Sequence, residues 1–213
     1  MRIAVDCDLT VVDTAHHWWE WLNKVTLSDN PYPLFEDGVV DYDLTKYYKK
    51  ELDAIGIDGY EFWRSSTLYD TLVPIDGAVE VLQHLHELGH EIIFVSTIKG
   101  SHHKSKYYFL KRYFPFMKGF VATKEKHLVG CDVIIDDRNN VLNKFINTLC
   151  VKRSTEFTQD TDLPVGAVSF KNWCEVTNII EEYECKILSK TSMIGMMSQK
   201  FLSITQRKLK KED

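Results

Sequence analysis

The stretch RIAVDCDLTVVDT, residues 2–14, decides how the rest of the chain is interpreted. Its first half, residues 2–7, is apolar enough to predict a buried β-strand, yet it carries Asp6 and Asp8 two positions apart. Side chains at positions i and i+2 of a strand point to the same face. Two carboxylates placed in this way repel each other, and partial burial strengthens the repulsion. The pair therefore predicts a bound cation at this point of the fold.

Helices and strands alternate from residue 74 onward. Residues 76–88 carry apolar side chains at the i, i+3, i+4, i+7 spacing of an amphipathic helix, and Gly89 follows as its C-terminal cap. Further helices are predicted over 103–114, 138–147 and 172–184, and strands over 91–97, 119–123, 132–137, 148–152 and 166–170. These strands are apolar throughout, which is typical of a parallel sheet covered on both faces. The pattern predicts a doubly wound α/β fold.

The segment between residues 14 and 73 breaks this alternation. It contains predicted helices over 14–27, 43–55 and 58–68, with Thr14 as the N-cap of the first, and no strand. We interpret it as a small helical cap, rich in aromatic side chains, inserted after the first strand. The chain then divides into a core formed by residues 1–13 and 74–185, a cap formed by 14–73, and a C-terminal extension formed by 186–213.

The charge of the chain is unevenly distributed. The 213 residues carry a net charge of −5, but residues 186–213 hold seven Lys/Arg and two acids, which gives +5 there and leaves −10 for residues 1–185. An acidic body argues against a generic nucleic-acid binder. The basic extension has apolar residues at helical spacing, so we expect it to dock on the body or on a second subunit of a homo-oligomer. An anionic partner and disorder of the extension are the alternatives.

Composition places the protein in a broad class. With 44% apolar and 27% charged residues, the chain has the composition of a globular protein. No apolar run reaches the ~18 residues of a membrane-spanning helix, and no signal-peptide pattern precedes the first strand. The five cysteines are odd in number and form no CxxC pair, which favours a reducing compartment. We therefore expect a cytoplasmic protein without a membrane span.

Polar residues stand where the predicted strands end. Three strands end in such pairs: Asp6 and Asp8, Ser96 and Thr97, Asp136 and Asp137. Ligands of open α/β sheets bind at the carboxyl ends of the strands, and Lys126, ten residues before Asp136, is expected at the same edge. Such a set suits phosphoryl transfer: a carboxylate attacks phosphorus, Mg²⁺ takes oxygen ligands, and hydroxyl and amine donors stabilise the phosphate oxygens.

These residues resemble the motifs of the haloacid dehalogenase-like superfamily. Asp6, Asp8 and Thr10 resemble its first motif, the strand closed by Ser96 and Thr97 its second, Lys126 its third and VIIDD its fourth. The stretches LVPIDGAVEVLQHL, FVSTIK, TKEKHLVGCDVIIDDR and NWCEV further resemble the 5′(3′)-deoxyribonucleotidase family, in order and in spacing. The resemblance covers about residues 2–185 and is thin in the cap.

The resemblance implies a role for each site residue. Asp6 would be the nucleophile, and Asp8 would be the general acid/base and a metal ligand through its backbone carbonyl. The Mg²⁺ ligands would be Asp6, Asp8, Asp137 and, beside it, Asp136. The phosphate-binding residues would be Ser96, Thr97 and Lys126. Apart from the resemblance, the aromatic side chains of the cap predict that Trp18 and Tyr42 line the substrate pocket by stacking and apolar contact, and Thr14 is expected there because it stands at the family's base-contacting position.

The chain departs from the family pattern in places. Leu9 replaces the commoner Gly of the first motif, Thr14 stands where relatives have an aromatic residue that contacts the base, and no Pro follows Thr97. The last two departures bear on nucleotide specificity. The histidines have no metal-like partners at helical spacing and are expected to face solvent or the pocket rim: His16, His17, His102 and His103.

The implied function is that of a Mg²⁺-dependent phosphomonoesterase acting on nucleoside monophosphates, deoxynucleotides first. Two enzymatic alternatives are a phosphatase for another small phosphate ester and one for a nucleic-acid 3′-phosphate. A non-catalytic module that binds a phosphorylated ligand is the alternative from another class; loss of Asp6 or Asp8 would mark it, and both are present.

Overall fold

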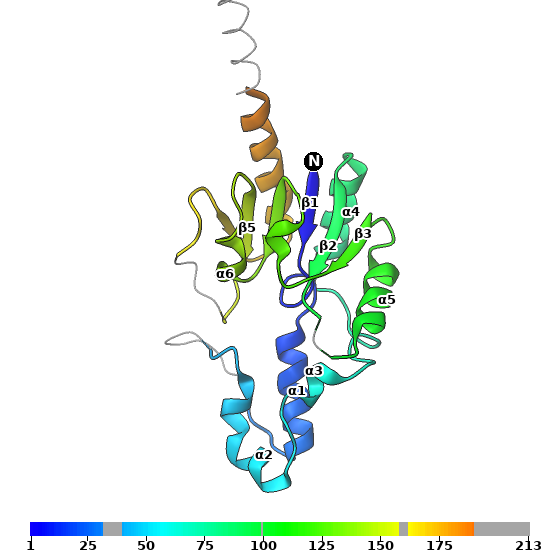
Figure 1. The fold of residues 1–213 in the computed structure, drawn as a ribbon, viewed down its shortest axis with the longest axis vertical. Coiled ribbons are helices and arrows are strands. Elements are labelled where there is room, and N and C mark those ends of the chain that lie inside the picture. The colour runs from blue at the N-terminus through cyan, green and yellow to red at the C-terminus, as the bar shows by residue number, and fades with distance from the viewer. Residues whose placement is uncertain (32–39, 99, 158–161, 190–213) are drawn as a thin grey trace, which may run out of the picture. The chain divides into compact units, whose positions relative to one another are not determined.

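A computed structural model describes residues 1–31, 40–98, 100–157 and 162–189. Within these residues the chain builds one sheet of six parallel strands in the order β3-β2-β1-β4-β5-β6 (Figure 1). The strands are β1 (Arg2–Val5), β2 (Glu91–Ser96), β3 (Gly119–Ala122), β4 (Val133–Asp136), β5 (Leu149–Arg153) and β6 (Val168–Phe170). The chain builds outward from β1 to β3 and then returns to β4 on the other side of β1. The predicted doubly wound parallel α/β sheet is confirmed.

The two central strands are buried because flanking helices cover the sheet. Ile3, Ala4 and Val5 of β1 expose 1% or less, and all four residues of β4 are buried. Part of the core is a cluster whose buried members are Ala4, Val95, Ile134, Leu142, Phe145 and Cys150. The register pairs Val5 with Phe94 of β2 and with Ile135 of β4, so the polar residues that follow these strands emerge at one edge of the sheet.

Helices and turns connect the later strands. They are α4 (Ala78–Glu87), α5 (His103–Tyr113), the 3₁₀ turn η2 (Lys126–Leu128) and α6 (Asn139–Leu142). Gly89 follows α4 at φ 92°, a conformation that favours glycine. The predicted helix over 138–147 is much shorter in the structure, because the amides of Lys144 and Phe145 donate to carbonyls only three residues back, at 3.1 and 3.0 Å.

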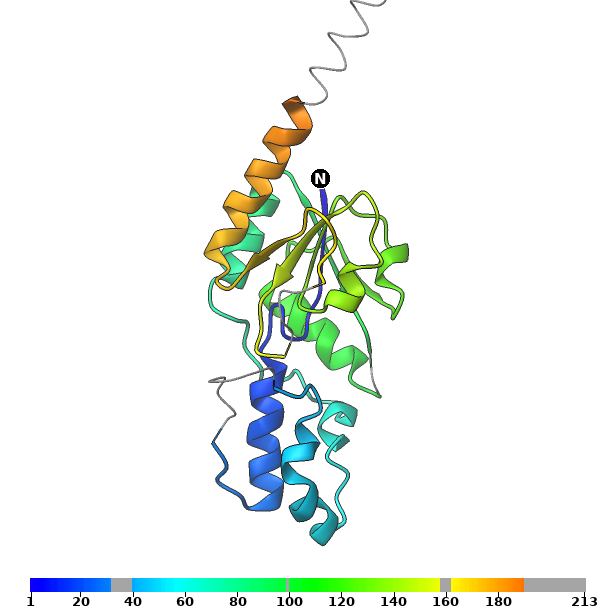
Figure 2. The same ribbon diagram turned by 90° about the vertical axis from the view of Figure 1, so that its left-hand side faces the viewer.

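The segment inserted after β1 is helical, as predicted. Its elements are α1 (Thr14–Thr26), the 3₁₀ turn η1 (Leu44–Tyr48), α2 (Lys49–Ile55) and α3 (Glu61–Arg64), and they lie beyond the carboxyl ends of the strands (Figures 1 and 2). The N-cap of α1 is Asp13 rather than Thr14, because the Asp13 carboxylate accepts from the His16 amide at 3.1 Å. The predicted helix over 58–68 is wrong beyond α3, where Ser65 is extended and its hydroxyl accepts from the Thr67 amide at 3.4 Å.

The chain divides into two compact units, residues 1–174 and 175–213. A helix over 174–189 opens the second unit. The rest of the basic extension, including the apolar positions Ile194, Met197, Phe201 and Ile204, lies outside the described residues, so its docking stays a prediction. In the described part of the chain, no helix is both long enough and apolar enough to cross a membrane.

Candidate active site

The loop after β1 carries the first two carboxylates. The Asp6 amide donates to the Ile135 carbonyl of β4 at 2.9 Å, which fixes Asp6 at the end of the paired strands. The chain then turns sharply, and the Val11 amide donates back to the Cys7 carbonyl at 2.9 Å. Leu9, within this turn, has a φ of 56°. Asp6 and Asp8 are therefore held by a closed turn rather than by an open loop.

Lys126 lies between the carboxylates of two neighbouring strands. Its Nζ is 2.8 Å from Asp6 Oδ1 and 2.6 Å from Asp136 Oδ2, and it exposes only 4% of its side chain. Burial alone would lower the pKa of Lys126, but the charges of Asp6 and Asp136 outweigh it and raise that pKa above its ordinary value. Lys126 thus reaches the site that its spacing predicted, where it contacts the expected nucleophile.

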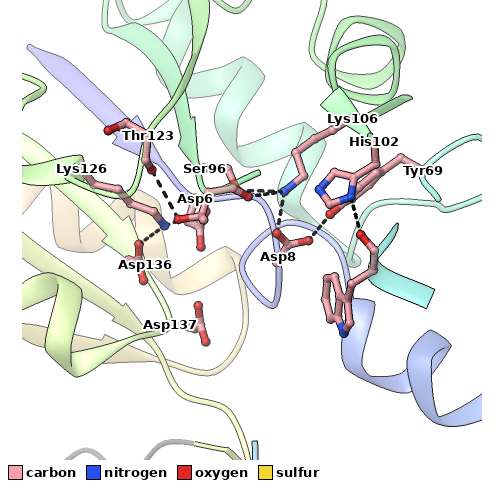
Figure 3. Close-up of polar contacts among 12 residues, drawn as sticks. Asp6, Asp8, Tyr69, Ser96, His102, Lys106, Thr123, Lys126, Asp136 and Asp137 are labelled. Carbon is pink, nitrogen blue, oxygen red and sulfur yellow. Dashed lines mark hydrogen bonds and ion pairs between the residues drawn. The ribbon is translucent and has the colours of Figure 1, made fainter. Parts of the chain in front are cut away.

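Three buried carboxylates form an acidic cluster at this edge (Figure 3). Asp6, Asp136 and Asp137 each offer an oxygen, and these atoms lie within 4.8 Å of one another. Burial raises the pKa of Asp136 to about 6 against the charge of Lys126, and Asp6 adds to the rise. Burial, Asp136 and Asp6 raise the pKa of Asp137 well above its ordinary value. An all-oxygen, electron-rich set of this size fits a hard divalent cation such as Mg²⁺.

Asp8 is held by two side chains that the motifs did not indicate. Lys106 Nζ lies 2.6 Å from Asp8 Oδ2, and the Tyr69 hydroxyl donates to Asp8 Oδ1 (Figure 3). Burial alone would raise the pKa of Asp8, but the charge and hydrogen bond of Lys106, and then the Tyr69 hydroxyl, lower it. Asp8 is therefore held as a carboxylate.

Lys106 also connects Asp8 to the second motif. Its Nζ donates to Ser96 Oγ at 3.0 Å and to the Thr97 carbonyl at 3.4 Å, and the side chain is wholly buried. A lysine in a predicted helix is normally expected to be exposed to solvent. The available signal was its position on the apolar face of α5, three and four residues before the buried Phe109 and Leu110.

A cavity of about 270 Å³ opens above these groups. The expected residues that line it include Asp6, Asp8, Trp18, Tyr42, Ser96, Thr97 and Lys126. Asp136 and Asp137 are buried at the end of β4 and are not among the lining residues. Thr14 is also fully buried and does not line the cavity, so the structure does not bear out its expected place in the pocket.

Aromatic rings form one wall of the cavity. Trp18 of α1 has its ring centroid 5.6 Å from that of Trp63 and 5.4 Å from that of Tyr60, and all three line the cavity. Tyr42 also lines it; its hydroxyl donates to Asp137 Oδ2 at 3.4 Å, and its ring centroid is 5.2 Å from the Arg138 guanidinium carbon. The sequence pattern had indicated Trp18 and Tyr42 but neither Trp63 nor Tyr60.

His102 differs from His16, His17 and His103 in its burial. It exposes 1%, lines the cavity, and its Nδ1 lies 2.9 Å from the Trp63 carbonyl. Of the two expected positions, facing solvent or at the pocket rim, the solvent-facing one is therefore wrong for it. Burial and the neighbouring Lys106 lower the pKa of His102, which favours the neutral ring. His16 and His103 are exposed, and His17 is half-buried.

Solved structures of known proteins share this fold. A haloacid dehalogenase-superfamily (HAD) hydrolase from Bacillus subtilis, solved bound to magnesium, has a TM-score of 0.57 at 15% identity, with 84% of this chain and 97% of that one covered. A protein from Thermotoga maritima assigned as a β-phosphoglucomutase has a TM-score of 0.57 at 14% identity, with 85% and 98% covered. At these identities the matches establish the fold, which is that of the haloacid dehalogenase-like class.

The family follows from the sequence match. The family model described as 5′ nucleotidase, deoxy (pyrimidine), cytosolic type C protein (NT5C) matches residues 1–188, and the chain belongs to this family. Over 147 residues the chain is 24% identical to the mitochondrial 5′(3′)-deoxyribonucleotidase of Homo sapiens and 23% identical to that of Mus musculus. These matches cover 66% of this chain but only 64% and 66% of the two relatives, less than two thirds of either.

Proposed function

We propose that this chain is a Mg²⁺-dependent phosphomonoesterase that acts through a phosphoaspartate on nucleoside monophosphates, deoxynucleotides first. The observation that carries the proposal is the pair Asp6 and Asp8 at one end of the cavity, each in contact with its own buried lysine. The family match and the names of the two curated relatives support a nucleotide as the substrate. The magnesium in the Bacillus subtilis structure supports the choice of metal.

In the first step, the Asp6 carboxylate attacks phosphorus as the bond to the leaving oxygen breaks. Asp8 gives a proton to that oxygen. Because the pKa of Asp8 is lowered in the free protein, Asp8 must take up this proton when substrate binds; the like charge of the phosphate dianion raises that pKa and favours the uptake. Ser96, Thr97 and Lys126 face the same cavity and donate to the equatorial phosphate oxygens, where charge is greatest in the transition state.

In the second step, water attacks the phosphorus of the phosphoaspartate. Asp8, now a carboxylate again, takes a proton from this water, and the bond between phosphorus and Asp6 breaks. When held by Asp6, Asp136 and Asp137, Mg²⁺ would offset the repulsion between the carboxylate and the phosphate. Lys106 and Tyr69 keep Asp8 aimed at the cavity between the two steps.

The aromatic wall supports a flat leaving group. Trp18, Tyr60 and Trp63 lie on the cap side of the cavity, and a nucleobase stacks on such rings. The cavity volume of about 270 Å³ suits a single small molecule.

The test is phosphate release by the purified full chain from a panel of 5′- and 3′-nucleoside monophosphates, sugar phosphates and p-nitrophenyl phosphate. Each is measured with Mg²⁺ and with EDTA, and Asp6→Asn serves as the matched control because it keeps the size and removes the nucleophile. We expect nucleotides to be the best substrates, and Asp6→Asn and EDTA to reduce release to the blank. Substantial turnover by Asp6→Asn would refute the covalent mechanism, and a preference for sugar phosphates would refute the substrate class.

A further inference from the structure

The turn that carries Asp8 is held by donors from three distant parts of the chain. Three successive carbonyls accept from them: Leu9 from Arg153 Nη1 at 2.5 Å, Thr10 from Trp173 Nε1 at 3.1 Å, and Val11 from the Ile75 amide at 2.8 Å. Inside the turn, the Leu9 amide donates to the Val12 carbonyl at 2.8 Å. The conformation of the turn is therefore determined by long-range contacts as well as by local ones.

The backbone conformation of Leu9 is strained. Its φ of 56° lies in the left-handed region, where the Cβ of an L-residue approaches the following carbonyl oxygen. Four non-glycine residues in the described part of the chain have positive φ, namely Leu9, Leu27, Asn147 and Asp162, and Leu9 alone among them is buried. Strained residues persist only where the surrounding structure over-determines them, and they gather at functional sites. The residue next to Asp8 meets both conditions.

Of the three side-chain and backbone donors, Arg153 is the one that bonds to the strained residue, Leu9. It closes β5, at the same edge of the sheet as the acidic cluster, and its Nη1 reaches the Leu9 carbonyl across the turn. An arginine is always charged, so this is a charge-assisted hydrogen bond, stronger than a neutral one. Burial lowers the pKa of Arg153, and the negative charges of Asp13, Asp137 and Glu156 partly offset this.

We propose that Arg153 is a positioning residue: by holding the Leu9 carbonyl, it keeps the turn in the left-handed conformation that aims Asp8 at the cavity. The inference rests on the proposed function, in which Asp8 moves a proton. A glycine at position 9 adopts this φ without strain and needs no such contact. Leu9 and Arg153 are therefore a matched pair, and the effect of replacing one depends on the identity of the other.

The first test is a double-mutant cycle with Arg153→Met, Leu9→Gly and both together, measured as kcat and KM for the best nucleotide. We expect Arg153→Met to lower kcat by about 10²-fold, the cost of a misplaced catalytic group, with KM nearly unchanged. Adding Leu9→Gly should recover most of that loss. Arg153→Lys, which keeps the charge without the planar fork, should remain impaired.

If Arg153 instead acted only through the effect of its charge on Asp137, the expected results would be the opposite. In that case Arg153→Lys would behave like the unmodified protein, Leu9→Gly would rescue nothing, and Arg153→Met would shift the Mg²⁺ concentration needed for half-maximal activity. Any of these three results would overturn the positioning role.

A second readout does not depend on activity. Amide hydrogen exchange of residues 9–12 should accelerate at least about tenfold in Arg153→Met and return toward the unmodified rate in the double variant, because exchange follows local opening. Trp173→Phe is the matched control: it removes the donor to Thr10, which is not strained, so Leu9→Gly should not reverse its effect. Unchanged exchange in Arg153→Met refutes the inference even if the chain proves to have no phosphatase activity, and a failed phosphatase assay alone refutes only the proposed function.

Discussion

Replacing Lys106 by Met removes the only lysine contact of Asp8 among the described residues. The pair is closely bonded, at 2.6 Å, and Lys106 has no exposed surface while Asp8 keeps 20% of its side chain exposed. Met has a similar length and no charge, so the variant leaves Asp8 with the Tyr69 hydroxyl as its remaining side-chain donor. Ser96 Oγ loses its donor at 3.0 Å in the same change.

The expected loss follows from this geometry. Removing one partner of a buried ion pair costs about 3–5 kcal/mol of unfolding free energy, and the partial exposure of Asp8 places the value near 3 kcal/mol. The pKa of Asp8 is lowered in the folded protein, so the pair stabilises the fold above the ordinary value of 3.8 and loses this effect as the pH falls through the lowered value. The loss in Lys106→Met should therefore be full at pH 7 and should shrink on acidification, where protonated Asp8 needs no cation.

The assay is urea unfolding followed by circular dichroism, on metal-free protein at pH 7 and at acid pH. Lys111→Met, the same substitution at an exposed position of α5, is the matched control and should stay within about 0.5 kcal/mol of the unmodified protein. Asp8→Asn combined with Lys106→Met should lose less than the two single losses added together. A loss below about 1 kcal/mol at pH 7, or strict additivity with Asp8→Asn, would refute this account of Asp8.

Three further outcomes test the site. Asp8→Asn should lower kcat by about 10²–10⁴-fold, measured as phosphate release, with an unchanged circular dichroism spectrum; near-normal turnover would remove Asp8 from the mechanism. Folding favours the protonated forms of Asp136, whose pKa is about 6, and of Asp137, so metal-free protein should lose stability as the pH rises from about 4 to 6. Mg²⁺ should then raise the melting temperature more at pH 7 than at pH 5, and an equal rise at both pH values would contradict this account. Trp63→Ala should lower kcat/KM about 10–100-fold for a nucleotide, because the variant removes the stacking of one base on the indole ring, and much less for p-nitrophenyl phosphate. Equal losses for both substrates would make Trp63 a structural residue.

The sheet and the acidic edge were predictable from the sequence because both depend on local patterns. Wholly apolar strands between helices indicate parallel pairing, and the carboxyl ends of parallel strands meet at one edge. Topology therefore brings Asp6 and Asp136 to one edge, and there Lys126 Nζ lies 2.8 Å from Asp6 Oδ1 and 2.6 Å from Asp136 Oδ2. Their roles in catalysis stay predictions, as does the division into core and cap.

The contacts of Asp8 were not predictable in the same way. Lys106 is 98 residues from Asp8 and Tyr69 is 61 residues away, and neither stands at a strand end. A lysine in a helix is normally solvated, and only its register with Phe109 and Leu110 indicated burial. The helices predicted over 58–68 and 138–147 are too long for another reason. The Ser65 hydroxyl accepts from the Thr67 amide, and the amides of Lys144 and Phe145 donate to carbonyls three residues back, and a propensity pattern does not reveal such local bonds.

The two carboxylates of the opening stretch are balanced by different partners, which agrees with the separate roles proposed for them. Asp6 shares Lys126 with Asp136 and belongs to the acidic cluster, whereas the Asp8 side chain lies outside that cluster and has Lys106 to itself. The four carboxylates at this edge, Asp6, Asp8, Asp136 and Asp137, carry four negative charges when ionised, and the two buried lysines supply two positive ones. Counting only these lysines and carboxylates, a charge of −2 remains with the cluster, and the neighbouring charges of Arg138 and Arg153 offset part of it. In the proposed mechanism the cluster would hold the metal beside Asp6, and the Asp8 side chain, outside the cluster, would carry the proton.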